Sequence, residues 1–236
     1  SSQVQWVVAA VPGKEWAKQV FPEKSEAQAM ESLWEAIFCA VRIQDGDAVQ
    51  AWREHDALLS EKCEILNKYQ FTELHYENEA GTDFRVGLVK NHIWEGGSEE
   101  SGSGVRFIAN MPTEEVFTMP DYRKAEGKVV SSRPLSYRGN LIKDFSLTFH
   151  EGKVVDFDAR EGYDALKQLL DTDEGSKSLG EVALVPYASP ISEMGILFYN
   201  TLFDENASCH LALGECYPTT VQDGEKMNEE ELHQIG

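Results

Sequence analysis

Apolar residues recur at helical spacing in two segments near the start of the chain. In the first segment, Ser25 and Gln28 have the spacing of a capping box at a helix N-terminus. The apolar positions that follow form one stripe at i, i+3, i+4, i+7, i+8 and i+11, namely Met30, Leu33, Trp34, Ile37, Phe38 and Val41. In the second segment, Asp47 is a favourable N-cap for a helix over residues 48–67. Its inward face would consist of Trp52, Leu59, Cys63 and Leu66. The pattern therefore predicts two long helices.

Other segments have the pattern of strands. Residues 4–11 are almost entirely apolar and end at Pro12-Gly13, which predicts a buried strand. Alternating apolar residues predict strands at 84–88 and 105–109. Residues 95–104 between them are rich in Gly and Ser, which favours a flexible connection.

The C-terminal half is also rich in predicted strands. Residues 145–149 and 155–159 alternate on either side of Glu151-Gly152, which predicts a hairpin in which Phe145, Leu147 and Phe149 pair with Val155, Phe157 and Ala159. A short helix is expected over 163–170 and a strand over 181–185, whereas 222–236 reads as a polar, acid-rich surface segment with one or two helical turns. Helices that cluster early and strands that dominate later indicate an α+β fold with a mixed sheet.

Charge and cysteine usage narrow the classes of function. The chain has 236 residues and a net charge of −20, and this acidic excess disfavours binding to nucleic acids and to anionic membrane surfaces. It has no apolar run of about 18 residues that could span a bilayer. The four cysteines form no CxxC pair, and residues 1–3 show no secretion signal, so we expect a cytoplasmic protein without disulfides.

His210 is the histidine that most suggests chemistry. It follows Asp204 and Glu205, and it opens an apolar run that reads as a strand. An imidazole beside carboxylates suits Zn²⁺ and similar ions. A histidine satisfied within the core is the alternative, and the other five histidines, which are His55, His75, His92, His150 and His233, are interpreted as structural or solvated.

Three glutamates are further candidates. Glu114 and Glu115 lie between a Pro-Thr turn and an apolar pair, where a solvated corner is the alternative. Glu181 leads an apolar strand, where a carboxylate is costly unless it is paired or binds metal, and ordinary exposure at the strand end is the alternative. Cys209 and Cys216 flank His210, but buried free thiols explain them more simply than a thiolate site.

Three segments stand out together. They are residues 110–118 (NMPTEEVFT), 179–185 (LGEVALV) and 198–214 (FYNTLFDENASCHLALG). In this order they resemble the bacterial metallo-aminopeptidases of the aminopeptidase T and aminopeptidase S (PepS) type. The placement of Trp16-Ala17, Phe21-Pro22 and Leu33-Trp34 is also similar to that family, so the resemblance covers essentially the whole chain.

The resemblance implies a site with two divalent metal ions, which could be zinc, cobalt or manganese. It assigns Glu115, Glu205 and His210 as ligands, and Glu181 as the ligand that bridges both ions. It also implies that Tyr217, seven residues after His210, hydrogen-bonds the reacting carbonyl. The implied activity is release of N-terminal amino acids from peptides by a cytoplasmic homodimer. Glu114 would be a proton shuttle or, more simply, an outward-facing neighbour of the ligand.

One departure from the family pattern affects these expectations. The family completes its metal shell with a His-x-Asp pair downstream of this region, whereas the only histidine here after His210 is His233, followed by Gln234-Ile235. The family also has an N-terminal domain before the strand that starts here at Val4. The resemblance therefore implies that residues 1–236 are most of a metal-binding catalytic domain, incomplete at both ends, which as a fragment would be nearly inactive.

Two other functions use the same residues. A non-catalytic peptide-binding or interaction module that has lost the His-x-Asp pair would account for the departure. Glycoside hydrolysis by two of Glu114, Glu115 and Glu181 would require two active-site carboxyl groups about 5–5.5 Å or about 6.5–9.5 Å apart. No sugar-stacking pattern of aromatic residues supports this last reading.

Overall fold

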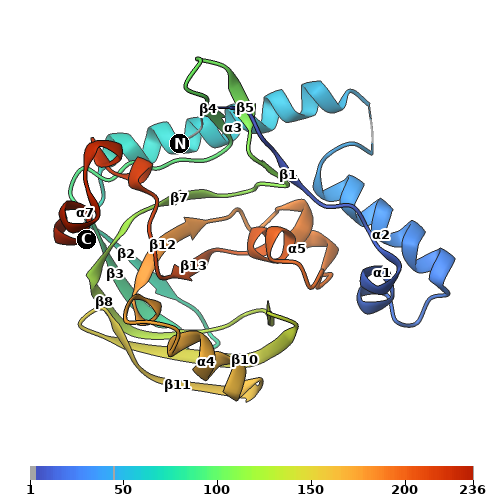
Figure 1. Ribbon diagram of the computed structural model, residues 1–236. Helices are drawn as coiled ribbons and strands as arrows, with labels where there is room; N and C mark the ends of the chain where they lie inside the picture. Colours follow the sequence, from blue (N-terminus) through green and yellow to red (C-terminus); the bar gives the residue numbers. More distant parts are fainter. Residues whose placement is uncertain (1–3, 45, 236) are drawn as a thin grey trace. The chain divides into compact units, whose positions relative to one another are not determined.

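The computed structural model describes residues 4–44 and 46–235 (Figure 1). Within these ranges the α-helices are α1 (Lys14–Val20), α2 (Glu26–Ala40), α3 (Ala48–Tyr69), α4 (Tyr163–Leu170), α5 (Pro190–Met194), α6 (Thr201–Asp204) and α7 (Glu229–Ile235). The strands are β1 (Val8–Ala9), β2 (Glu73–Glu77), β3 (Asp83–Leu88), β4 (Ser98–Glu100), β5 (Arg106–Ile108), β6 (Asn110–Met111), β7 (Val116–Thr118), β8 (Pro120–Val130), β9 (Leu135–Tyr137), β10 (Asn140–His150), β11 (Lys153–Glu161), β12 (Leu179–Leu184) and β13 (His210–Leu213). The expected α+β class is confirmed.

The chain forms two compact units, each built from three separate segments. The first unit contains Ser1–Cys63, Gly96–Val116 and Leu184–Cys209. The second unit contains Glu64–Glu95, Phe117–Ala183 and His210–Gly236. The expectation that residues 1–236 belong to one catalytic domain stays a prediction.

Helix α2 provides much of the core of the first unit. Its predicted capping box is present, because the Gln28 N–H donates to Ser25 Oγ (3.4 Å) and the Ser25 N–H donates to Gln28 Oε1 (3.1 Å). The buried face consists of Ala29, Leu33, Ala36, Ile37 and Ala40, which pack with Ala17, Ile191, Phe198 and Phe203. The predicted stripe is therefore wrong at Phe38, which is 37% exposed. Alanines line the inward face instead, and these small side chains let α1 and α5 approach α2 closely.

Helix α3 begins where the sequence predicts. The carboxylate of Asp47 accepts the N–H groups of Val49 (3.0 Å) and Gln50 (3.2 Å), which have no partner within the helix. Its buried residues are Trp52, His55 and Leu59. Helix α1 was not predicted from the sequence, because it is only 7 residues long and its N-cap, Gly13, makes no side-chain hydrogen bond.

The segment expected to be a flexible connection is ordered. β4 pairs antiparallel with β5, and Asp56 on α3 accepts the Ser98 N–H at 2.7 Å. Arg106 adds an ion pair to the same carboxylate at 3.2 Å. The flexible reading was wrong because these partners come from α3, about forty positions earlier in the chain, where composition within the segment cannot reveal them.

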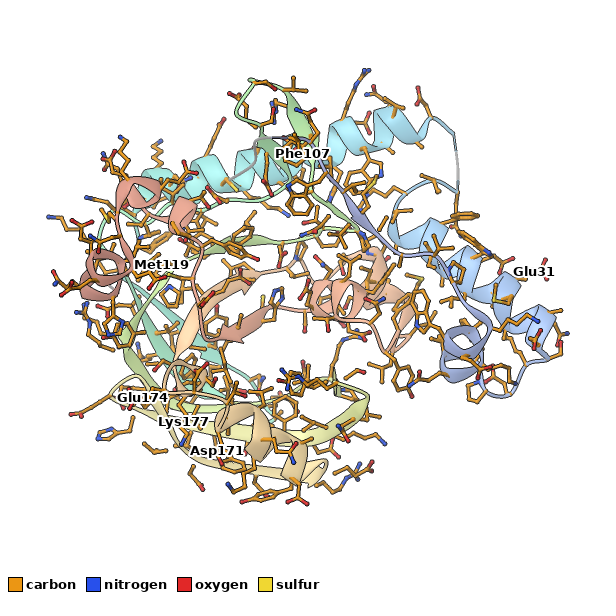
Figure 2. The ribbon with its side chains drawn as sticks, viewed as in Figure 1. Glu31, Phe107, Met119, Asp171, Glu174 and Lys177 are labelled. Atoms are coloured by element: carbon orange, nitrogen blue, oxygen red, sulfur yellow. The ribbon has the colours of Figure 1, made fainter. Side chains whose placement is uncertain are left out.

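The N-terminal strand is shorter and more exposed than predicted. Only Val8 and Ala9 are in β1, which runs parallel to β6, and Trp6 packs against Phe107 with ring centroids 6.1 Å apart (Figure 2 labels Phe107). The valines of this run are exposed in the described part of the chain. The burial prediction was wrong because an apolar run shows a capacity for packing and not the presence of a packing partner. The expectation of no secretion signal at residues 1–3 lies outside the described residues.

In the second unit, a sheet of antiparallel strands has the order β11-β10-β8-β3-β2, with β9 added to β10. The predicted hairpin is present, with Glu151 and Gly152 both at positive φ (49° and 81°), as a two-residue type I′ turn requires. A register shift after Thr148 places Val154 opposite Phe149, so Val154 is 8% exposed and Val155 is 61% exposed. The predicted inward position of Val155 is therefore wrong by one residue. Helix α4, predicted at these bounds, packs on β10 and β11 (Figure 1).

Most residues of the smaller sheet β13-β12-β7 belong to the second unit. β12 starts two residues earlier than predicted, and β13 starts at His210. The C-terminal segment ends in α7, in agreement with the expected one or two helical turns. Among the described residues, none of the helices combines the length and apolar character needed to cross a bilayer.

Candidate metal centre

Glu181 and His210 are brought together by the pairing of β12 with β13. In this antiparallel pair Glu181 lies opposite Ala212, and Ala183 lies opposite His210. Side chains two residues apart on a strand point to the same face, so Glu181 and His210 are diagonal neighbours on one face of the sheet. Two of the residues selected from the sequence are therefore adjacent in the fold.

The geometry of this pair suits a shared cation. His210 Nε2 lies 3.7 Å from Glu181 Oε1, and the two side chains are only 18% and 16% exposed. This separation is too long for a direct hydrogen bond. A tetrahedral ion with bonds of about 2.0–2.1 Å holds its ligand atoms about 3.4 Å apart, which is close to the observed spacing. Imidazole nitrogen and carboxylate oxygen are also the donor types that Zn²⁺ and related ions accept.

Gly180 allows the chain after His210 to return beside Glu181. A Cβ at Gly180 would lie 2.1 Å from the carbonyl oxygen of Glu215 and 2.4 Å from that of Gly214, so only glycine fits this close approach. The turn continues to Tyr217, which is 62% exposed and contacts Phe117 with ring centroids 5.9 Å apart. The second unit therefore holds Glu181, His210 and Tyr217 on a strand pair and the turn that follows it.

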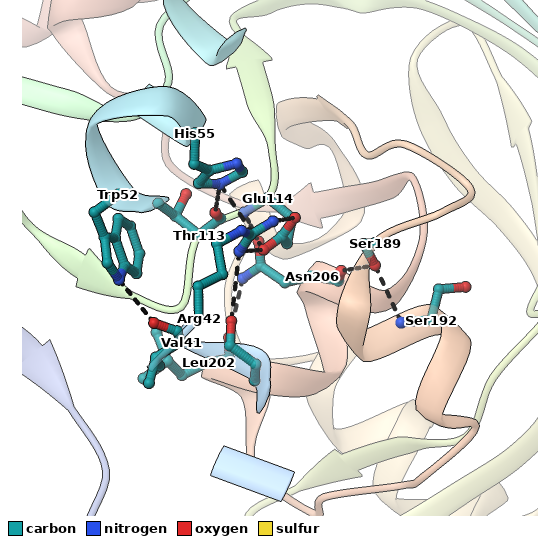
Figure 3. Close-up of polar contacts among 11 residues, drawn as sticks. Val41, Arg42, Trp52, His55, Thr113, Glu114, Ser189, Ser192, Leu202 and Asn206 are labelled. Carbon is teal, nitrogen blue, oxygen red and sulfur yellow. Dashed lines mark hydrogen bonds and ion pairs between the residues drawn. The ribbon is translucent and has the colours of Figure 1, made fainter. Parts of the chain in front are cut away.

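Glu114 and Glu115 belong to the first unit and are both buried. The predicted alternative of a solvated corner is wrong, as is the outward orientation of Glu114, which is 2% exposed. Arg42 donates to both carboxylate oxygens of Glu114, with 2.8 Å between Nη2 and Oε2 (Figure 3). Both oxygens of Glu114 are thus engaged, which does not suit a proton shuttle. Glu115 directly precedes β7.

The two residues of the acidic pair Asp204 and Glu205 also differ in role. Asp204 accepts the N–H groups of Phe198 (2.7 Å) and Asn200 (3.0 Å), so its carboxylate holds the loop before α6. Glu205 begins a 3₁₀ turn, Glu205–Ala207, and is half-buried. In each pair the first acid has a structural role, and the second is the residue that the family pattern assigns to metal.

Two of the remaining histidines are buried. They are His55 and His92, so the solvated alternative does not apply to either. Their structural interpretation holds, because His55 Nε2 lies 2.7 Å from the Thr113 carbonyl oxygen and His92 Nδ1 lies 3.0 Å from that of Val89. All four cysteines are free thiols, and the predicted burial is wrong for Cys209, which is exposed.

Burial of His92 predicts acid sensitivity of this chain. Desolvation lowers the pKa of His92 below its usual 6.5, so the folded state holds the ring neutral while the unfolded chain protonates near pH 6.5. Stability is then lost as the pH falls below that value, by at most about 1.4 kcal/mol per pH unit for this group, until the lowered pKa is reached. In urea unfolding at pH 7.5 and 5.5, His92→Asn should lose less stability on acidification than the wild type. Equal losses would contradict this.

A surface cavity of about 310 Å³ also lies in the second unit, lined by Lys153, Leu170, Asp171, Asp173, Glu174 and Lys177. Figure 2 labels Asp171, Glu174 and Lys177 there. The lysines Lys167 and Lys177 bind Asp171 and lower the pKa of its carboxyl group. No imidazole or thiolate lines this cavity, so it offers a poorer donor set for a transition metal than Glu181 with His210.

Glu114 has two partners that were not predicted from the sequence, Arg42 and Asn206. Arg42 Nη1 and Nη2 bind its carboxylate, and Asn206 Oδ1 accepts its backbone N–H at 2.7 Å. A weak signal exists for Arg42, because it lies two residues after the end of α2, at a position where glycine is usual. For Asn206 the sequence offers none beyond its place in the acidic motif.

Comparison with known proteins identifies relatives along the whole chain. Residues 1–236 match the family described as thermophilic metalloprotease (M29). The chain is 51% identical to aminopeptidase AmpS of Bacillus subtilis over 236 residues, which is 100% of this chain and 57% of that protein. It is 43% identical to aminopeptidase T of Thermus aquaticus over 217 residues, which is 92% of this chain and 53% of that protein.

A solved structure agrees with this relationship. Wild-type AmpT from Thermus thermophilus superimposes with a TM-score of 0.87 at 42% identity, covering 94% of this chain and 54% of that one. The chain thus spans little more than half the length of these relatives.

Proposed function

Because the chain belongs to the thermophilic metalloprotease (M29) family, we propose that the protein carrying it is a metal-dependent aminopeptidase that releases N-terminal residues from peptides. Membership of a metalloprotease family implies the use of divalent metal. The observation that carries the proposal for this chain is the approach of Glu181 Oε1 and His210 Nε2 to 3.7 Å on paired strands.

The proposed ligands are Glu115, Glu181, Glu205 and His210. The family pattern supports this set, and with two ions Glu181 would be a ligand that both could share. Zinc, cobalt and manganese all suit a carboxylate-rich shell with one imidazole. The same pattern places a His-x-Asp pair in sequence that this chain does not include.

The proposed chemistry divides between metal and protein. Divalent cations held by these residues would supply Lewis-acid chemistry, binding the free α-amine of the substrate, polarising the scissile carbonyl and lowering the pKa of a water molecule. Tyr217 donates a hydrogen bond from its phenol to the carbonyl oxygen and stabilises the negative charge that develops there. Glu181 and His210, held on a sheet rather than on loops, keep their donor atoms in fixed positions.

The test uses the whole protein and two matched peptides, one with a free N-terminus and one with an acetylated N-terminus. We expect release of the first residue only from the free peptide. Dialysis against a chelator should abolish the activity, and added Zn²⁺, Co²⁺ or Mn²⁺ should restore it. Equal cleavage of the acetylated peptide, or full activity after verified removal of metal, would contradict the proposal.

The family resemblance also implies a homodimer in the cytoplasm, and both belong to this proposal. Light scattering of the whole protein at several concentrations would measure the mass, for which twice the chain mass is expected. A monomer at all concentrations would contradict the dimer and leave the proposed chemistry standing.

A further inference from the structure

The first unit contains a buried polar network that joins the neighbours of two proposed ligands (Figure 3). We propose that Arg42, Glu114 and Asn206 are positioning residues that hold Glu115 and Glu205 at the spacing that metal binding requires. This inference rests on the proposed function, because it assigns a role toward the ligands named there.

Arg42 occupies a strained backbone position. Helix α2 ends in the double hydrogen bond of a Schellman motif, in which the Arg42 N–H donates to Cys39 O (3.1 Å) and the Ile43 N–H donates to Phe38 O (2.9 Å). The residue at this point has φ of 56°, where glycine is the usual choice because a Cβ is unfavourable there. A strained non-glycine residue persists when its surroundings fix it, which points to a role for the Arg42 side chain.

The Arg42 side chain holds the carboxylate of Glu114 in place. The guanidinium of Arg42 binds both oxygens of the Glu114 carboxylate, and the Arg42 side chain is itself 20% exposed. A bidentate pair of this kind fixes orientation as well as charge. Because the Glu114 side chain is 2% exposed, loss of Arg42 would leave a buried carboxylate without its main cationic partner. The buried ring of His55, 3.8 Å from Glu114, lies on the same network.

Asn206 connects this anchored residue to the second ligand segment. Its Oδ1 accepts the Glu114 N–H at 2.7 Å, and its Nδ2 donates to the Leu202 carbonyl oxygen at 2.9 Å. Its own carbonyl oxygen accepts the Ser189 hydroxyl at 3.0 Å, and that hydroxyl also caps α5 through the Ser192 N–H. Asn206 is 1% exposed, so these bonds are shielded from water.

Both ends of this hydrogen-bonded connection adjoin a proposed metal ligand in the sequence. Glu114 directly precedes Glu115, and Asn206 directly follows Glu205. One hydrogen bond from the Glu114 N–H to Asn206 Oδ1 therefore ties the backbone next to one proposed ligand to the side chain of the residue next to the other. Replacing residues that orient metal ligands without contacting the metal commonly changes metal affinity about 10–100-fold.

The test compares four variants of the whole protein with the wild type. Arg42→Met removes the bidentate pair, Arg42→Lys keeps the charge without the fork, and Asn206→Leu removes the bridging amide. Leu33→Ala, in the buried core of α2, is the matched control, because it lowers stability but removes no hydrogen bond of the network. Zinc affinity is measured by competition with a chromophoric chelator, and hydrogen exchange of the Glu114 amide is measured in metal-free protein.

We expect Arg42→Met and Asn206→Leu to weaken zinc binding by about 10–100-fold and to speed exchange of the Glu114 amide, with Arg42→Lys between them and the wild type. Leu33→Ala should leave both readouts unchanged in the folded protein. If wild-type protein binds zinc and the network variants bind it equally well, or if Leu33→Ala weakens binding as much as they do, the positioning role is wrong and the proposed function stands. Wild-type protein that binds no divalent metal would overturn both.

Discussion

Replacing Glu181 with glutamine is expected to remove bound metal from the whole protein and to lower kcat/KM by well over about 100-fold. Replacing a residue that only orients the metal ligands already lowers metal affinity or activity by up to about 100-fold. Glutamine has nearly the same shape but carries no charge, so it cannot neutralise a divalent cation or bridge two of them. The strand pair should survive the change, because glutamine keeps the size of the side chain and the backbone pairing of β12 with β13 does not involve it.

Metal content per chain by elemental analysis, together with peptide release, measures this effect. Glu161→Gln is a suitable control, because Glu161 is also a strand glutamate of the second unit, but it is exposed and paired with Lys143 at 2.8 Å. The control should keep its metal and its activity. Full metal content and full activity in Glu181→Gln would show that the carboxylate is not a ligand.

Tyr217→Phe is expected to lower kcat by about 10²–10³-fold, which is the usual cost of removing one hydrogen-bond donor to a developing oxyanion. Metal content should not change, because the phenol is proposed to contact the substrate and not the metal. The fold should tolerate the change, since the Tyr217 backbone carbonyl, and not its hydroxyl, accepts the Thr220 N–H that forms the turn.

A kinetic comparison separates this role from a general loss of structure. KM should change little, because the hydrogen bond strengthens mainly in the transition state. Tyr187→Phe is the control, since Tyr187 is 95% exposed and has no assigned role. An unchanged kcat in Tyr217→Phe, or an equal loss in Tyr187→Phe, would remove Tyr217 from the mechanism.

Elements governed by local pattern could be predicted from the sequence. The capping box at Ser25, the Asp47 cap and the Glu151-Gly152 turn depend on residues a few positions apart, and all three are present. The predicted inward position of Val155 was wrong because a bulge shifts the register by one residue, which moves the side chain to the other face of the sheet. The prediction that residues 95–104 are flexible was wrong because their partner, Asp56, is distant in sequence.

The candidate site shows the same division. Glu181 and His210 could be selected because each opens or leads an apolar strand, and the pairing of those strands then places them together. The roles within the two acidic pairs could not be told from the sequence, because they depend on which carboxylate meets Arg42 or the loop before α6. Burial of Glu114 could not be predicted either, because the ion pair that compensates the buried charge joins residues 72 positions apart.

Anomalous diffraction from zinc-soaked crystals of the whole protein would locate the metal ion proposed at Glu181 and His210. We expect an anomalous peak at the zinc edge about 2.0–2.2 Å from a Glu181 carboxylate oxygen and from a ring nitrogen of His210. Zinc bound at full occupancy by other side chains, with Glu181 and His210 in contact only with each other or with water, would contradict the proposal.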